Sequence, residues 1–156
     1  MAGYVLRPAV EQDFPHIQKL IISGQINPSG LDWRRFVVIE QAGSIIACGQ
    51  IKPHRDGCQE LASIAVQPEF RGQGIARKII EHLMAEYGGG PLYLMCRSSL
   101  GPLYEKFGFR VLSQEEMPKY FRRVSKLAGL IEPLRGSGDT LLAMGRNEDG
   151  GGEARE

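Results

Sequence analysis

A glycine-rich turn is the segment of this sequence whose residue types and spacing most directly indicate chemistry. It reads Arg71-Gly72-Gln73-Gly74-Ile75-Ala76. Gly72 and Gly74 leave the backbone N–H groups of the turn unshielded, and the N–H groups that follow belong to the open N-terminus of a helix. Such donors converge on an anion, and the positive end of the helix dipole stabilises it further. Arg71 adds a full charge in a forked geometry that suits phosphate oxygens, so the turn indicates phosphate binding.

Two well-known phosphate-binding loops do not fit these residues. A Walker A loop needs Lys followed by Ser or Thr after its last glycine, where this sequence has Ile75 and Ala76. A dinucleotide fingerprint needs Gly or Ala where Arg77 stands, and then a parallel strand that carries an acidic residue. For the two glycines alone, a tight strand-to-helix turn that binds nothing remains an open alternative.

The elements that must position this turn follow from the hydrophobic pattern. Residues 75–87 are the clearest helix, because apolar side chains recur there at spacings of three and four. Further helices are expected at 13–23, 102–107 and 118–127, and strands at 4–7, 35–40, 45–51, 60–66, 92–96, 109–112 and 140–144. The three strands between 35 and 66 form an antiparallel meander, which predicts a mixed α/β fold and not a doubly wound parallel sheet. We expect one domain over 4–145 and a disordered, glycine-rich polar tail over 146–156.

Composition narrows the class of protein. The chain has 156 residues, of which 42% are hydrophobic and 24% charged, and its formal net charge is only +1. A protein that grips nucleic acid normally has a strongly basic face, so no nucleic-acid partner is expected. The sequence has no apolar run of membrane-spanning length and no signal pattern, which predicts a cytoplasmic protein with no membrane partner. Its three cysteines form no Cys-x-x-Cys pair and have no histidine at ligand spacing, so no metal site is expected.

The glycine-rich turn resembles the Arg/Gln-x-x-Gly-x-Gly/Ala signature of the GNAT superfamily of N-acetyltransferases. The similarity extends upstream over 60–70 and downstream to Leu103-Tyr104-Glu105-Lys106-Phe107-Gly108-Phe109, which is similar to the second hallmark of the family. Together with the strand order it covers roughly 4–144. The resemblance implies the GNAT fold, a central mixed and mostly antiparallel sheet with a splayed parallel pair of strands, flanked by helices. It also implies acetyl-coenzyme A as the cosubstrate.

The same resemblance assigns residues to the coenzyme. The turn would hold the pyrophosphate, and the backbone of the strand at 64–66 would pair with the pantetheine arm. A backbone N–H near Ile64 or Ala65 would then point at the thioester oxygen. The family often has Asn where this chain has Ser98 and Ser99, which puts that pantetheine contact in doubt. The expected coenzyme-binding residues are Ile64, Ala65, Val66, Arg71, Gly72, Gln73, Gly74, Ile75, Ala76, Ser99, Tyr104 and Lys106.

Two residues are expected to carry the catalysis. Glu60 stands where several GNAT enzymes have a catalytic Glu, which removes a proton from the amine directly or through water. The alternative is a solvated carboxylate at the end of a strand. Tyr104 matches the Tyr that many members place beside the coenzyme sulfur, where a neutral phenol protonates the leaving thiolate. The alternative for Tyr104 is packing in the core.

The sequence says less about the amine that accepts the acetyl group than about the coenzyme that donates it. The expected reaction is direct transfer in a ternary complex to a primary amine of a small molecule, an amino acid or a protein. Segments 27–33, 53–57 and 115–123 are the candidates to line the acceptor site. Arg122 and Arg123 belong to a charged helix face that is expected to be simply solvated, and the alternative is that one of them meets the carboxylate of a small acidic substrate. The order of motifs is similar to the acetyltransferase domain of N-acetylglutamate synthases, although the same motifs occur in many other members. A catalytically silent acyl-coenzyme A sensor or assembly module is the alternative, and a homodimer is left open.

Overall fold

The computed structural model describes residues 3–135 and 138–147, with side chains described outside 128–135. Its internal contacts form two compact units, Met1–Lys52 with Leu61–Gly88 and Pro53–Glu60 with Gly89–Glu156. Most of the expected tail, 148–156, lies outside the described residues. No helix in the described ranges is both long and apolar enough to cross a membrane.

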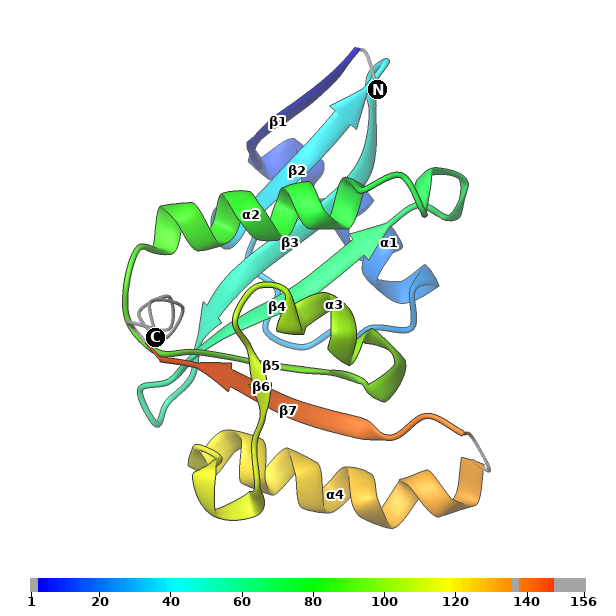
Figure 1. The fold of residues 1–156 in the computed structure, drawn as a ribbon. Coiled ribbons are helices and arrows are strands. Elements are labelled where there is room, and N and C mark those ends of the chain that lie inside the picture. The colour runs from blue at the N-terminus through cyan, green and yellow to red at the C-terminus, as the bar shows by residue number, and fades with distance from the viewer. Residues whose placement is uncertain (1–2, 136–137, 148–156) are drawn as a thin grey trace. The chain divides into compact units, whose positions relative to one another are not determined.

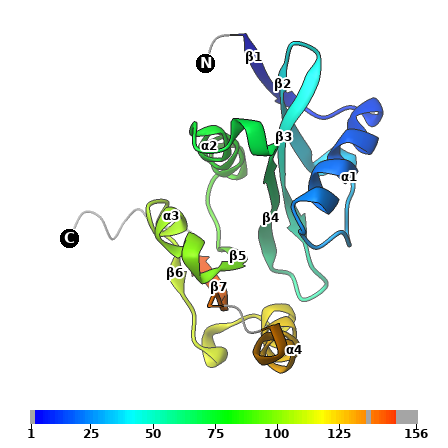
Figure 2. The same cartoon turned by 90° about the vertical axis from the view of Figure 1, so that its right-hand side faces the viewer.

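The first unit contains four strands and two long helices. These are β1 (Tyr4–Pro8), α1 (Phe14–Ser23), β2 (Phe36–Gln41), β3 (Ser44–Pro53), β4 (Gln59–Val66) and α2 (Ile75–Tyr87). The last residue of β3 and the first two of β4 belong to the second unit. The strand order is β1-β2-β3-β4, with β1 and β3 antiparallel to β2 (Figure 1). Figure 2 shows α1 and α2 on opposite faces of these strands.

Both helices form because one side of each is apolar. Ile75, Ile79, Ile80 and Leu83 are the buried residues of α2, and Ile17, Leu20 and Ile21 are those of α1. Gly49 of β3 allows α2 to approach the sheet closely. A Cβ at this position would lie 2.5 Å from Ile79 Cγ2 and 2.7 Å from Ile64 Cδ1, closer than side-chain carbons pack.

The second unit contains the start of β4 and the rest of the sheet. Its further elements are β5 (Leu92–Arg97), α3 (Gly101–Glu105), β6 (Arg110–Val111), α4 (Lys119–Arg135) and β7 (Leu141–Arg146). Glu60 of β4 is the parallel partner of Tyr93 in β5. β7 lies between β5 and β6 and is antiparallel to both, which gives the order β5-β7-β6. The expected fold class, a mixed and mostly antiparallel sheet with one parallel pair, is confirmed. The splay of that pair stays a prediction.

Two elements near the C-terminus extend beyond the ends expected for them. α4 continues to Arg135 instead of ending near residue 127. Gly129 does not end it, because a glycine inside a helix costs only about 1 kcal/mol relative to alanine. β7 includes Arg146, which the sequence had assigned to the tail, because this residue pairs with Leu92 of β5.

Candidate functional site

The glycine-rich turn between β4 and α2 is open on its outer side. Gly72 and Gly74 have φ of 77° and 79°, in the left-handed region where a side chain is strained. A Cβ added to either residue would have no other heavy atom within 4 Å. The backbone conformation, and not crowding, therefore requires glycine here, and the N–H groups of the turn remain uncovered.

Donors without intrahelical partners lie directly after this turn. α2 begins at Ile75 with Gly74 as its N-cap, and its first turn contains no acidic side chain. The first N–H groups of any helix lack intrahelical partners and carry partial positive charge. Arg71 is exposed, and its Nε donates to the Val66 carbonyl at 3.1 Å, while its two Nη atoms make no hydrogen bond within the described part of the chain. The turn thus has the donors and the charge that a diphosphate needs.

The strand residues expected to pair with pantetheine follow an irregularity in β4. Ser63 has φ of 61°, unusual for a residue with a side chain, and it is buried. Gln50 holds it, because Gln50 Nε2 donates to Ser63 Oγ at 2.8 Å. Cys48 Sγ lies 3.6 Å from the Ser63 carbonyl oxygen. The backbone of β4 therefore departs from regular strand geometry immediately before Ile64, which the sequence did not predict.

Glu60 is paired with a histidine in the second unit. His54 Nε2 lies 2.7 Å from Glu60 Oε1, and each side chain is only 11% exposed. The imidazole stacks on the ring of Tyr120 with centroids 3.7 Å apart and an angle of 18° between the planes, and Phe121 meets it edge-on. From the sequence, His54 was included only as part of the segment 53–57, a candidate to line the acceptor site, and no partner was expected for it. The one feature of the sequence that could have indicated the contact is the short separation of His54 and Glu60 along the β3–β4 hairpin.

Asp56 links this hairpin to α4. Its Oδ2 accepts from the Tyr120 N–H and its Oδ1 from the Cys58 N–H, both at 3.0 Å. Partial burial opposes ionisation of this carboxyl, but the hydrogen bonds from Tyr120 and Cys58 outweigh it and lower the pKa of Asp56 to about 2. The carboxylate therefore caps the start of α4 from outside the helix and holds Tyr120 beside His54.

Tyr104 lies on α3 and is 7% exposed, with its ring edge-on to Phe109 at 6.2 Å. Burial, and secondarily the neighbouring Cys96, raises the pKa of Tyr104 to about 12. The phenol is therefore neutral at physiological pH and retains the proton that a general acid must donate. Its packing in the core and its expected role as an acid are compatible.

Ser99 and Lys106, which were also expected to bind the coenzyme, differ from each other in their surroundings. The Ser99 hydroxyl donates to Asp139 Oδ2 at 3.1 Å, and the Ser98 hydroxyl donates to Asp139 Oδ1 at 3.0 Å. Hydrogen bonding from Ser98 is the largest cause that lowers the pKa of Asp139. Lys106 is exposed at the end of α3. Asp139 had no signal in the sequence.

The segments expected to line the acceptor site are partly held by internal hydrogen bonds. Arg122 donates to the carbonyls of Gln114 and Met117, at 3.2 and 2.9 Å, and so closes the turn before α4. Arg123 is exposed. In the first unit, the ammonium of buried Lys52 donates to the carbonyl of Ser29 at 3.1 Å. Arg122 is thus engaged within the described part of the chain, whereas Arg123 is available to a ligand.

None of the three thiols has the environment of a nucleophile. Burial is the largest cause in each case, and it raises the pKa of Cys48 and of Cys58 to about 12 and that of Cys96 to about 11. A thiolate is the reactive form of cysteine, and it is disfavoured at all three positions. Among the described residues, no three His, Cys, Asp or Glu side chains are grouped so that they could hold a metal ion.

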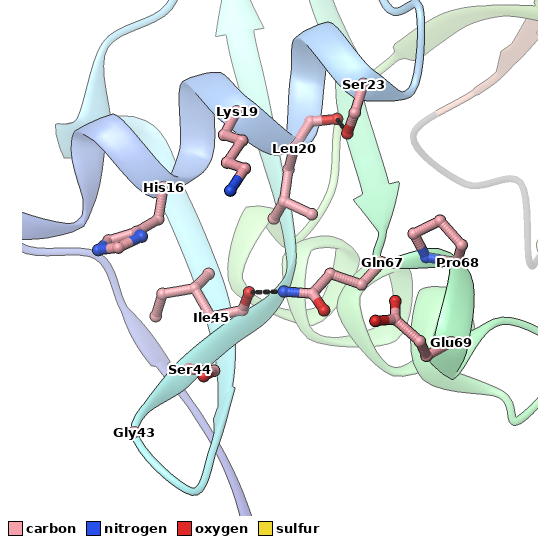
Figure 3. Close-up of a pocket in the computed structure, with 10 residues that line it drawn as sticks. All are labelled: His16, Lys19, Leu20, Ser23, Gly43, Ser44, Ile45, Gln67, Pro68 and Glu69. Atoms are coloured by element: carbon pink, nitrogen blue, oxygen red, sulfur yellow. Dashed lines mark hydrogen bonds between the residues drawn. The ribbon is translucent and has the colours of Figure 1, made fainter.

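A pocket of 410 Å³ lies in the first unit (Figure 3). It is lined by residues of α1, of the β2–β3 turn and of the segment after β4, namely His16, Lys19, Leu20, Ser23, Gly43, Ser44, Ile45, Gln67, Pro68 and Glu69. Gln67 bridges two of these walls, since its Nε2 donates to the Ile45 carbonyl at 2.9 Å. None of the residues expected from the sequence to bind coenzyme or to catalyse lines this pocket.

Comparisons with known proteins agree with the resemblance. An amino-acid acetyltransferase of Neisseria meningitidis is 26% identical over an alignment of 132 residues that covers 76% of this chain but only 30% of that protein. The structure of N-acetylglutamate synthase from Neisseria gonorrhoeae with coenzyme A and N-acetyl-glutamate has a TM-score of 0.66 at 21% identity, covering 92% of this chain and 35% of that one. The ribosomal-protein-S18-alanine N-acetyltransferase of Escherichia coli has a TM-score of 0.58 at 20% identity, covering 91% and 92%.

The two structural likenesses show the fold alone at these identities. The family itself is shown by a match between residues 32–111, half of the chain, and the model of the acetyltransferase (GNAT) domain. This chain therefore belongs to the GNAT family of acetyltransferases.

Proposed function

We propose that this chain binds acetyl-coenzyme A and transfers its acetyl group directly to a primary amine. The observation that carries the proposal is the open turn before α2, where two left-handed glycines with free space around them and the exposed Arg71 directly precede the positive end of a helix. The relative from Neisseria gonorrhoeae has coenzyme A in its structure, which supports this choice of anion.

Each part of the donor has a proposed partner. The turn at 71–76 holds the pyrophosphate, and the backbone at 64–66 pairs with the amides of pantetheine. The irregular residue Ser63 changes the course of β4 just before this segment, which supports a specialised role for the backbone there. An N–H of Ile64 or Ala65 then stabilises the charge that develops on the thioester oxygen.

The chemistry requires three proton transfers, two from nitrogen and one to sulfur. A lysine-like amine is about 99.9% protonated at pH 7, so Glu60 takes the first proton from it, directly or through a water molecule. The free amine attacks the thioester carbon, the C–S bond breaks, and the second proton on nitrogen leaves through water and restores the Tyr104 phenol after its own proton has gone to sulfur. Tyr104 protonates the leaving thiolate, and its raised pKa keeps the donor form fully populated at neutral pH.

Direct transfer is preferred to an acetyl-cysteine intermediate. A covalent route needs a thiolate beside a base. The raised pKa values of Cys48, Cys58 and Cys96 support the direct route, in which donor and acceptor are bound together.

The acceptor is proposed only as a primary amine. The relatives include an amino-acid acetyltransferase and an enzyme named for an alanine of a ribosomal protein, so both small and protein amines belong in the test. Arg123 would favour an acidic small molecule over a basic one. Cytoplasmic location and a monomeric or dimeric state stay predictions, to be tested by cell fractionation and light scattering.

Calorimetry with coenzyme A and acetyl-coenzyme A tests the donor site. Gly72→Ala should weaken binding at least tenfold, because a methyl group would both strain the left-handed backbone and cover the N–H donors. Gly43→Ala is the matched control, since Gly43 also has a left-handed φ of 82° and open space around it, but lies in the β2–β3 turn. No affinity of the unmodified protein for either coenzyme would refute the proposal.

Release of free thiol with a panel of amino acids, polyamines and peptides tests the transfer. We expect amine-dependent release together with an acetylated product detected by mass spectrometry. Binding of the coenzyme without turnover of any amine would instead favour the silent acyl-coenzyme A binder.

A further inference from the structure

The contact between His54 and Glu60 divides the carboxylate into two unlike oxygens. Oε1 lies 2.7 Å from the imidazole Nε2, so a proton must lie between these two atoms. Oε2 has no hydrogen-bond partner within the described part of the chain. One oxygen is therefore held in place, and the other is left to accept a proton.

The imidazole is held by more than the carboxylate. The ring of Tyr120 covers one face of it at 3.7 Å, and Phe121 meets it edge-on at 6.0 Å. The backbone N–H of His54 donates to the Cys58 carbonyl at 3.0 Å, which fixes the hairpin that carries the ring. Ring stacking, the carboxylate and the hairpin together leave the imidazole little freedom to rotate.

Among the described residues, few titratable groups lie around His54 and Glu60, and neither of the two on the hairpin competes for the imidazole. From the hairpin they are Asp56 and Cys58, from α4 Tyr120, and from β5 Tyr93, which lies opposite Glu60 in the sheet. Both oxygens of Asp56 accept from backbone N–H groups, so that carboxylate does not compete for the imidazole. Burial raises the pKa of Cys58 to about 12, so its thiol stays neutral.

We propose that His54 is a positioning residue that aims Glu60 Oε2 at the acceptor amine and makes the basicity of Glu60 depend on the charge of the imidazole. This inference rests on the proposed function. With a neutral imidazole, Nε2–H holds Oε1, and Oε2 takes the proton from the ammonium group, directly or through water. The nitrogen lone pair then attacks the thioester carbon, the C–S bond breaks as Tyr104 gives its proton to the departing sulfur, and the surplus proton on nitrogen passes through water to restore the Tyr104 phenol. Protonation of His54 places a full positive charge beside Glu60, which weakens it as a base.

The expected pH dependence has a defined sign. An imidazole gains its charge as pH falls through the range of about 8 to 5. The loss of activity caused by protonation of His54 is therefore absent at high pH and grows as pH falls. The amine substrate also loses activity as it is protonated, but this effect is common to all variants and cancels in a ratio between them.

The test compares two substitutions of His54 across pH 5 to 9, using whichever amine is turned over. His54→Gln keeps an N–H donor for Oε1 but cannot gain charge, and His54→Leu provides no donor. We expect kcat/KM of His54→Gln within about tenfold of the unmodified enzyme at pH 8, as its donor still holds Glu60. His54→Leu should lose on the order of 100-fold relative to His54→Gln at every pH, the range of a displaced general base.

The decisive measurement is the ratio of kcat/KM between the unmodified enzyme and His54→Gln. This ratio should be constant at the high end of the pH range and should fall as pH is lowered and the imidazole gains its charge. His16→Gln is the matched control, because His16 is exposed on α1, and its ratio should not change with pH. A constant ratio for His54→Gln, or equal kcat/KM for His54→Leu and His54→Gln, would overturn the proposal.

A second measurement needs no turnover. In the free protein, the Nε2–H proton should appear as a downfield NMR signal that exchanges slowly with water, and Glu60→Ala should abolish it. Absence of this signal in the unmodified protein would also overturn the proposal. If the signal is present but no amine is acetylated, the proposed function fails while the His54–Glu60 pairing stands, so the two failures can be told apart.

Discussion

Replacement of Tyr104 by phenylalanine separates its role in packing from its role as a proton donor. The ring is 7% exposed and contacts Phe109 edge-on at 6.2 Å, and both features survive in the variant. Only the hydroxyl group is removed. The variant should therefore fold, bind acetyl-coenzyme A with unchanged affinity and lose turnover.

The size of the loss follows from the pKa of the donor. Burial raises the pKa of Tyr104 to about 12. A thiol has a reference pKa of about 8.5, so complete proton transfer to a free thiolate would be uphill by roughly 5 kcal/mol. The phenol therefore assists mainly through its hydrogen bond to the sulfur, as negative charge develops there while the C–S bond breaks. General acids contribute about 100- to 10,000-fold, and a donor this weak belongs at the lower end, near 100-fold or about 3 kcal/mol.

The assay is thiol release at saturating acetyl-coenzyme A, with calorimetry for affinity and thermal unfolding for stability. Tyr4→Phe is the control, because Tyr4 lies in β1 of the other unit. A thioester with a more acidic thiol needs less help from an acid, so it should show a smaller defect in Tyr104→Phe. Equal turnover of Tyr104→Phe and the unmodified enzyme on acetyl-coenzyme A would remove Tyr104 from the mechanism.

Three further predictions concern stability and the reaction route. Asp56→Ala should lower the free energy of unfolding by about 1 kcal/mol at pH 7, as loss of a helix cap does. Because the pKa of Asp56 in the folded state is lowered to about 2, the difference in stability between the variant and the unmodified protein should shrink as pH falls from 4 to 2. Denaturant titrations across this pH range measure it. Gly49→Ala should cost about 1–3 kcal/mol through its clash with Ile79, whereas Gly138→Ala, with open space around it, should be neutral in the same titrations. Cys58→Ser should retain full turnover, and an acetylated cysteine trapped in the unmodified enzyme would contradict direct transfer.

Local interactions explain why much of the fold could be predicted. The helix over 75–87 has the bounds that its apolar spacing indicated, because a helix depends on residues three and four apart. The predicted ends of the three meander strands lie within two residues of the observed ends. The reason is the same, since alternation and turn residues are local signals. Gly72 and Gly74 are a local signal as well, because each has a left-handed backbone conformation that favours glycine.

Pairings between distant segments could not be predicted in this way. β7 inserts between β5 and β6, and Gly145 allows this because a Cβ there would lie 2.9 Å from the ring of Tyr93. No periodicity within a strand specifies its neighbour. The left-handed Ser63 depends likewise on Gln50, thirteen residues away, and no turn signal precedes it.

The sequence by itself determined the class of fold, the family and the place of the glycine-rich turn before α2, because each depends on residues close together along the chain. It also indicated Glu60 and Tyr104 through their places in two short motifs. Only the tertiary structure decided that Glu60 is paired with His54, that Tyr120 covers the imidazole and that Asp56 holds Tyr120 there. Asp56 and Tyr120 are 64 residues apart, and hydrogen bonds and ring contacts over such separations form only when the chain has folded.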